Sequence, residues 1–137
     1  MSNNVSYKIL TAKAATGQST LIPVSDFNNI TFVTVSAAGS TLTYKFQGAI
    51  EIPGLGSGAP VDFGAASTIT NPWDYVDVID LEDAASIDGD TGVALTTTAE
   101  TRQFTVNVEG LDYVSIDITA RSAGSLTAFV ALYNYNR

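Results

Sequence analysis

Apolar and polar residues alternate with a period of two through most of this chain, and this pattern constrains the fold more than any other feature. β-branched and aromatic residues dominate the alternating runs, as is typical of strands. No window of twelve or more residues holds the period of 3.6 expected of an amphipathic helix, although Ala84 and Ala85 fit one short helical turn. The pattern predicts strands over residues 30–35, 41–46, 104–109, 114–119 and 126–131, and shorter ones over residues 6–11, 20–24, 73–80 and 93–98.

Turn signals separate these runs and set the domain organisation. The tripeptide Ala-Gly-Ser occurs at residues 38–40 and 123–125, where glycine allows the positive φ of a tight connection. The stretch PGLGSGAP at residues 53–60 is expected to be a surface loop. Eight or nine short strands without helices predict an all-β protein, an antiparallel β-sandwich with jelly-roll-like topology and about eight strands. Residues 1–20 are expected to form an N-terminal arm or a first strand, and residues 21–137 one sandwich domain.

A faint internal repeat links the two Ala-Gly-Ser turns. The segment that starts at Phe27 resembles the segment that starts at Leu111, at an offset of 84 residues that slips by one at the turn. The repeat is interpreted as two similar hairpins, each contributing to a sheet, by duplication or by the shared chemistry of amphipathic hairpins.

The composition excludes several kinds of chemistry. The chain has 137 residues with no cysteine and no histidine, which excludes disulfides, Cys/His zinc sites, a cysteine nucleophile and a histidine base. Charged residues make up only 15%, whereas 29 residues are serine or threonine. No apolar stretch approaches the length of a membrane span, and no basic segment followed by an apolar one begins the chain, so no secretory signal is expected.

The negative charge is concentrated in one part of the chain. Fourteen acids and six bases give a net charge of −8, and ten of the acids but no base fall between Phe46 and Thr101. Phosphate repels such a segment, so neither nucleic acid nor an anionic membrane is expected as a partner. The acidic segment either meets a basic partner surface or keeps a lysine-poor protein soluble.

Carboxylates supply two candidate sites within this segment. Asp90-Thr91-Gly92 matches the tripeptide of aspartic proteases, but Asp88 and Gly89 precede it where that family has an apolar strand, so a turn is the better interpretation. Calcium binds clustered carboxylates, and the spacing here does not match an EF-hand loop. The calcium candidates are Asp80, Asp83, Asp88 and Asp90. No metal or other cofactor is expected overall.

Four aromatic residues are candidates for an interface or for a glycan site. Trp73 and Tyr75 follow Asn71-Pro72, and Tyr133 and Tyr135 lie near the C-terminus. Alternating exposed aromatics stack on sugar rings, and they equally anchor subunit interfaces, where tryptophan and tyrosine are enriched. A single tryptophan in a sandwich also commonly anchors the core.

The overall pattern resembles accessory structural proteins of tailed bacteriophage virions. The resemblance is carried by an apolar-acidic strand, a Gly-Asp-Thr-Gly turn before a threonine-rich strand, Gly-Leu-Asp-Tyr, a Ser-Ala-Gly-Ser-Leu-Thr hairpin, and the segment DFNNITF. These lie at residues 76–81, 89–98, 110–113, 122–127 and 26–32. The resemblance implies a capsid decoration or cement protein with a sandwich or jelly-roll domain, and many such proteins are trimers.

The sequence therefore predicts a non-enzymatic virion protein, assembled in the host cytoplasm, that acts by surface contact. Its expected partners are the major capsid protein or other virion proteins, and a homo-oligomer, with a trimer favoured. One alternative is a carbohydrate- or receptor-binding sandwich of a phage fibre or tail, anchored by the four aromatic residues. Another is a hydrolase that uses Asp90 of the Asp-Thr-Gly tripeptide.

Overall fold

The computed structural model describes residues 5–50 and 73–134, and within them the regular structure is entirely β. No helix in these residues is long and apolar enough to cross a membrane. The loop expected at residues 53–60 lies outside the described residues. The strands are β1 (Val5–Lys13), β2 (Gly17–Gln18), β3 (Ile22–Pro23), β4 (Asn29–Ser36), β5 (Ser40–Ala49), β6 (Asp74–Tyr75), β7 (Val78–Asp80), β8 (Ser86–Ile87), β9 (Val93–Thr98), β10 (Thr101–Asn107), β11 (Tyr113–Ala123) and β12 (Leu126–Tyr133).

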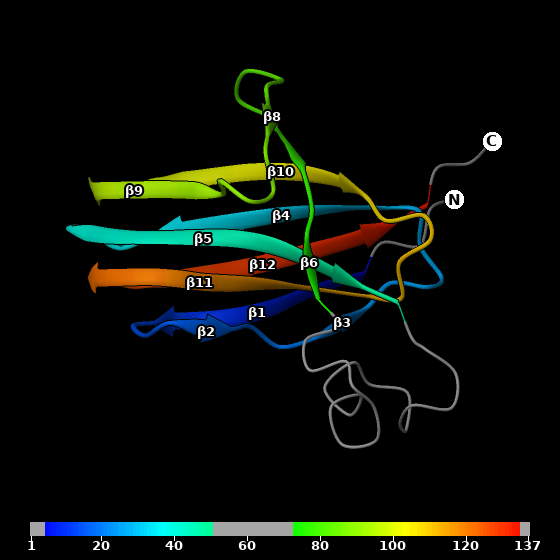
Figure 1. The fold of residues 1–137 in the computed structure, drawn as a ribbon, viewed down its shortest axis with the longest axis horizontal. Helices are drawn as coiled ribbons and strands as arrows, with labels where there is room; N and C mark the ends of the chain where they lie inside the picture. Colours follow the sequence, from blue (N-terminus) through cyan, green and yellow to red (C-terminus); the bar gives the residue numbers. More distant parts are fainter. Residues whose placement is uncertain (1–4, 51–72, 135–137) are drawn as a thin grey trace.

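Two antiparallel sheets lie face to face (Figure 1). Sheet A has the order β1-β12-β4-β10-β7-β8, and sheet B has the order β2-β11-β5-β6, with β3 on β11 and β9 on β5. In chain order the first long strand pairs with the last, β4 pairs with β10, and β5 pairs with β9. This nested pairing is that of one long hairpin rolled into a sandwich, which is the jelly-roll topology. The predicted fold class is confirmed, with β6, β7 and β8 added to the main strands.

The internal repeat has a different role from the one expected. Within each repeat the two strands lie in opposite sheets, because β4 and β12 belong to sheet A whereas β5 and β11 belong to sheet B. The hairpin interpretation is therefore wrong. The two copies instead pair with each other, β4 with β12 and β5 with β11.

The two Ala-Gly-Ser turns lock this pairing at one end of the sandwich. Ser40 Oγ donates to the backbone oxygens of Ala37 and Ser125, at 2.7 and 3.2 Å, and accepts the Ser125 N–H at 3.2 Å. Gly124 has a φ of +81°, and a Cβ there would collide with the backbone and side chain of Ser40. Glycine is required at this position both by its conformation and by the close approach of the turns.

Aromatic side chains from both sheets form the centre of the core. Phe32 and Phe104 reach in from sheet A, and Tyr44 and Phe46 reach in from β5 of sheet B. Ring centroids lie 4.8 Å apart for Phe32 and Phe46 and 5.0 Å apart for Phe46 and Phe104. The Tyr44 hydroxyl forms a 2.9 Å hydrogen bond with Thr34 Oγ1, and burial raises the pKa of Tyr44 to about 12.

The chain between β5 and β9 carries the short strands from one sheet to the other. The alternation at residues 73–80 predicts one strand, but the structure divides it into β6, which joins sheet B, and β7, which joins sheet A. In Figure 1 β6 crosses the other strands steeply, and the β7–β8 loop stands out from the sandwich. Ala84 has a φ of +60°, so the expected helical turn stops after one Ala84 N–H to Asp80 O bond.

Candidate functional site: the interaction surfaces

The outer face of sheet A is almost free of charge. Strand register places outward side chains from β1, β12, β4, β10 and β7 on this common face. Lys8 is the one charged residue among these positions, and none of them is acidic. The members are Ser6, Lys8, Thr127, Phe129, Ala131, Tyr133, Asn29, Thr31, Val33, Val35, Thr101, Gln103, Thr105, Asn107 and Ile79.

Apolar side chains on this face remain open to solvent. Phe129 is 37% exposed, Val35 36% and Ile79 39%, and Leu81, just beyond β7, is 49% exposed. Lys8 Nζ lies 5.6 Å from the centroid of the Phe129 ring. Register places Phe129 opposite Val33, two residues before Val35 on β4, whereas Thr31 and Thr105 separate this group from Ile79.

The outer face of sheet B has a polar network that is bonded within itself. Gln18 Nε2 donates to Gln47 Oε1 at 3.0 Å and to Ser115 Oγ at 2.9 Å, and Ser115 Oγ donates to Gln47 Oε1 at 3.0 Å. Ser115 is fully buried and Gln47 nearly so. Three strands, β2, β11 and β5, are thereby tied together by side chains as well as by their backbones.

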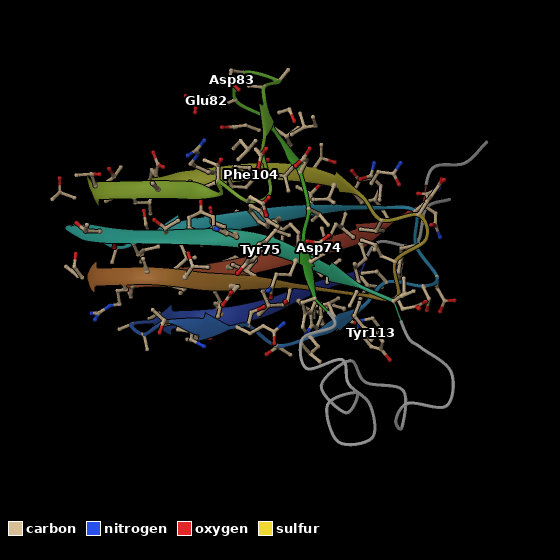
Figure 2. The ribbon with its side chains drawn as sticks, in the orientation of Figure 1. Asp74, Tyr75, Glu82, Asp83, Phe104 and Tyr113 are labelled. Atoms are coloured by element: carbon tan, nitrogen blue, oxygen red, sulfur yellow. The ribbon has the colours of Figure 1, made fainter. Side chains whose placement is uncertain are left out.

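Tyr75 extends this outer face from β6. Its hydroxyl donates to Asp117 Oδ2 at 3.0 Å, and Lys45 Nζ lies 4.6 Å from its ring centroid. Burial, followed by the hydrogen bond to Asp117, raises the pKa of Tyr75. Figure 2 shows Tyr75 beside Asp74 on β6, in front of the sheet. Both the hydroxyl and one ring face of Tyr75 are thus engaged by the protein itself.

The structure does not gather the four candidate aromatic residues into one site. Trp73 and Tyr75 lie together at β6 of sheet B, and both are half-buried. Tyr133 lies at the end of β12 in sheet A, and its hydroxyl is 3.4 Å from Thr31 Oγ1. Tyr135 lies outside the described residues. The largest buried side chains are Tyr44, Phe32, Phe46 and Phe104, so the single tryptophan is not the centre of the core.

The chain between β5 and β9 presents carboxylates to solvent. Its described part, residues 73–92, contains no base, and Figure 2 shows Glu82 and Asp83 at the tip of the projecting β7–β8 loop. Its exposed acids are Asp74, Asp77, Glu82, Asp83, Asp88 and Asp90. Asp77 Oδ1 accepts the Gly89 N–H at 2.8 Å, and Gly89 packs so closely on the backbone of Tyr75 and Val76 that a Cβ would collide there.

One acid of this segment, Asp80, is buried and holds the segment to sheet A. Asp80 Oδ2 accepts from Arg102 Nη2 on β10, and Asp80 Oδ1 accepts the Glu82 N–H at 3.0 Å. Burial alone raises the pKa of Asp80, but the Glu82 N–H and the Arg102 guanidinium together hold that pKa below its usual value. Arg102 also lies over the Phe104 ring and approaches Glu100 Oε1 at 3.6 Å, and its Nε is buried without a partner in the described structure.

The calcium candidates cap turns instead of converging. Asp83 Oδ1 accepts the Ala85 N–H at 2.9 Å, and Asp88 Oδ1 accepts the Asp90 N–H at 2.8 Å. Asp80 is bound to Arg102, as described above. Over residues 5–50 and 73–134, no three carboxylates gather into a group that could hold a metal ion.

The Asp-Thr-Gly tripeptide at residues 90–92 forms the turn that leads into β9. The backbone oxygen of Asp88 accepts the N–H groups of Thr91 and Gly92, at 3.1 and 2.9 Å. Gly92 has a φ of +68° and no room for a Cβ against Lys45 and the Tyr44 oxygen. Glycine at this position is therefore explained by conformation and packing.

The motifs in the sequence did not single out the outer face of sheet A. The composition of this face depends on which residues of separate strands lie side by side. The sequence of one strand alone does not show how that strand pairs with a distant one. A signal was nevertheless present: Val33 and Val35 are apolar on the face opposite Ile30 and Phe32, so β4 is apolar on both sides. Apolar residues on both faces are the pattern of a strand that is buried on both sides, although Val35 is exposed here.

No family model matches the sequence, and a search of curated proteins gives no match. Among solved structures, the SPBc2 prophage-derived protein YomS has a TM-score of 0.70 and 12% identity, covering 97% of this chain and 95% of that chain. The PBSX exported protein XepA has a TM-score of 0.67 and 11% identity over 96% of this chain. This chain spans 38% of the XepA chain. At these identities the likeness shows a shared fold.

Proposed function

We propose that this protein is a non-enzymatic structural component of a tailed-phage particle, and that it binds the shell surface as a capsid decoration or cement protein. The observation that carries the proposal is the outer face of sheet A, which has Lys8 as its one charged residue and where Phe129, Val35 and Ile79 remain exposed. YomS, described as prophage-derived, and the exported protein XepA share this fold over nearly the whole of the present chain, and the description of YomS supports a phage origin.

The size of this face suits a repeated contact more than a single tight one. With about 4.8 Å between strands and about 3.3 Å per residue, four strands of about seven residues cover roughly 450 Å² in projection. Stable single interfaces bury about 800 Å² on each partner. Attachment at many equivalent positions on one shell makes modest contacts effective together, because neighbouring contacts raise the effective concentration.

The acidic segment is proposed to lie towards solvent or at the rim of this contact. None of its exposed acids belongs to the outer face of sheet A as defined by strand register. Their negative charge disfavours association with packaged nucleic acid and keeps the outer surface of the particle soluble. We further propose that the protein self-associates, with a trimer favoured, and light scattering of the free protein would measure this mass.

Purified phage particles test the proposed function directly. Mass spectrometry should find the protein in the particles, and particles without it should lose resistance to heat or osmotic shock. Phe129→Glu adds a charge to the outer face of sheet A and should lower particle binding about 100-fold or more. Thr119→Glu adds the same charge to β11 of sheet B and should leave binding unchanged. Particles that lack the protein, or equal binding by both variants, would contradict the proposal.

Carbohydrate or receptor binding is the second candidate, favoured by the placement of Trp73 and Tyr75 together at β6. Lys45 covers one face of the Tyr75 ring. A sugar could therefore stack only on the other face of Tyr75 or on Trp73. A glycan array distinguishes the two functions: specific sugar binding that Trp73→Ala abolishes would favour this candidate, and an array without binding would remove it.

A further inference from the structure

One edge of sheet A is left open where β7 ends. β7 pairs with β10 through Asp80 opposite Phe104 and Ile79 opposite Thr105. The Leu81 N–H continues this pairing by donating to the Gln103 oxygen at 3.0 Å. The chain then turns away into the β7–β8 loop. Thr101 is therefore paired with Val35 of β4 on one side of β10, and nothing in the described structure pairs with it on the other side.

The backbone of β10 points its free groups into this opening. The Glu100 oxygen accepts the Ser36 N–H, which places residue 100 in a hydrogen-bonded pair with β4. Backbone groups alternate in direction along an antiparallel strand. The N–H and C=O groups of Thr101 and Gln103 therefore point away from β4. Over the described residues, the Gln103 N–H and both backbone groups of Thr101 form no hydrogen bond. They form a short template for a further strand.

A hollow of about 410 Å³ lies along this open edge. Its lining residues are Leu81, Glu82, Glu100, Thr101, Arg102 and Gln103. Asp80 already neutralises Arg102, so the carboxylates of Glu82 and Glu100 leave the hollow with an excess of negative charge. Leu81, which is 49% exposed, supplies an apolar contact.

We propose that this edge binds an extended, basic segment of another protein, which adds a short strand to sheet A beside β10. Its backbone would pair with Thr101 and Gln103, in the position beside β10 that the chain of β7 leaves after Leu81. Lysine or arginine at alternate positions would approach Glu82 and Glu100, whose charges favour a basic occupant over an acidic one. The inference uses the sheet edge and does not rest on the proposed function of the sheet A face.

Peptide titration of the full-length, ¹⁵N-labelled protein tests this inference. The probe is a capped peptide of about seven residues that alternates lysine with threonine, and the matched control peptide has glutamate in place of lysine. Amide shifts should appear at Thr101, Gln103 and Leu81 with the lysine peptide, should weaken as salt is added, and should be absent with the glutamate peptide. Shifts elsewhere, or none at all, would overturn the inference.

Variants separate backbone pairing from charge. Thr101→Pro removes an N–H that faces the hollow and not β4, so sheet A keeps its pairing while the peptide should bind about tenfold more weakly. The double variant Glu82→Gln/Glu100→Gln should weaken peptide binding severalfold and reduce the dependence of binding on salt. This variant tests the inference even if the fold does not tolerate proline at residue 101. Asp90→Asn removes an exposed acid outside the hollow and should change nothing. If all three variants bind the peptide with the same affinity as the parent protein, strand addition is refuted.

Discussion

The outer faces of the two sheets differ in what their polar and apolar groups contact. On sheet B, Gln18, Gln47 and Ser115 bind one another, and Tyr75 is held by Asp117 and Lys45. On sheet A, exposed Phe129 and Val35 stand among threonines, and only one charged residue shares the face. The side chains of sheet B thus complete their interactions within the chain, whereas those of sheet A leave apolar area uncovered.

Under the proposed function, this difference lets one jelly roll combine a stable domain with a binding surface. A network of satisfied buried hydrogen bonds contributes to stability and specifies how the strands of sheet B align. Exposed β-branched and aromatic side chains contribute little to the isolated domain and gain energy only when a partner removes them from water. Polar substitutions should therefore reduce stability on sheet B and reduce binding on sheet A.

The largest expected loss of stability comes from releasing β7 from sheet A. Asp80→Asn removes the buried partner of Arg102 and should cost about 2–3 kcal/mol in the free energy of unfolding, below the cost of breaking a fully buried pair because Glu100 remains near. It should also loosen Ile79, which belongs to the outer face of sheet A, and Leu81, which lies just beyond β7. Urea unfolding measures the first effect, and an unchanged midpoint would contradict it.

The same variant has a pH signature. The folded state holds the pKa of Asp80 below its usual value of 3.8, so this carboxylate stabilises the fold above that value. The stabilisation is lost as the pH falls through the lower, folded-state pKa. The free energy of unfolding of the parent protein should therefore fall more steeply below about pH 4 than that of Asp80→Asn. Parallel acid profiles for the two proteins would contradict this role.

A smaller change in the free energy of unfolding distinguishes the outer faces of the two sheets. Ser115→Val on sheet B removes one hydrogen bond from Gln18 Nε2 and one from Gln47 Oε1, which keep only their bond to each other, and should cost about 1–2 kcal/mol. Thr101→Val on sheet A makes the same kind of change at an exposed position and should stay within about 0.5 kcal/mol. Equal costs, measured by urea unfolding, would remove the distinction between the faces.

The alternation of apolar residues predicted the fold class because local periodicity reports which side of a strand is buried. It predicted the span of β9 and the central parts of β4, β11 and β12. It did not show that residues 73–80 divide between two sheets, because β6 and β7 are held by Gln47 and by Arg102, both distant in sequence.

The candidate site was harder to predict than the fold. Trp73 and Tyr75 were found by residue type, but the outer face of sheet A emerges only when β12, β4 and β10 are placed in register. The acidic segment was evident from its charge, whereas the burial of Asp80 depends on Arg102 of a strand that follows later in the chain. Residue types identify candidates, and pairing between distant strands decides which of them share a surface.

The central claim is that sheet A, and not sheet B, faces the partner in an assembled particle. Hydroxyl-radical footprinting tests it with two aromatic residues, Phe129 on sheet A and Tyr75 on sheet B, compared between free protein and purified particles. Oxidation of Phe129 should fall severalfold on assembly, while oxidation of Tyr75 should stay the same. Protection of Tyr75 with Phe129 still reactive would contradict the claim and assign the contact to sheet B.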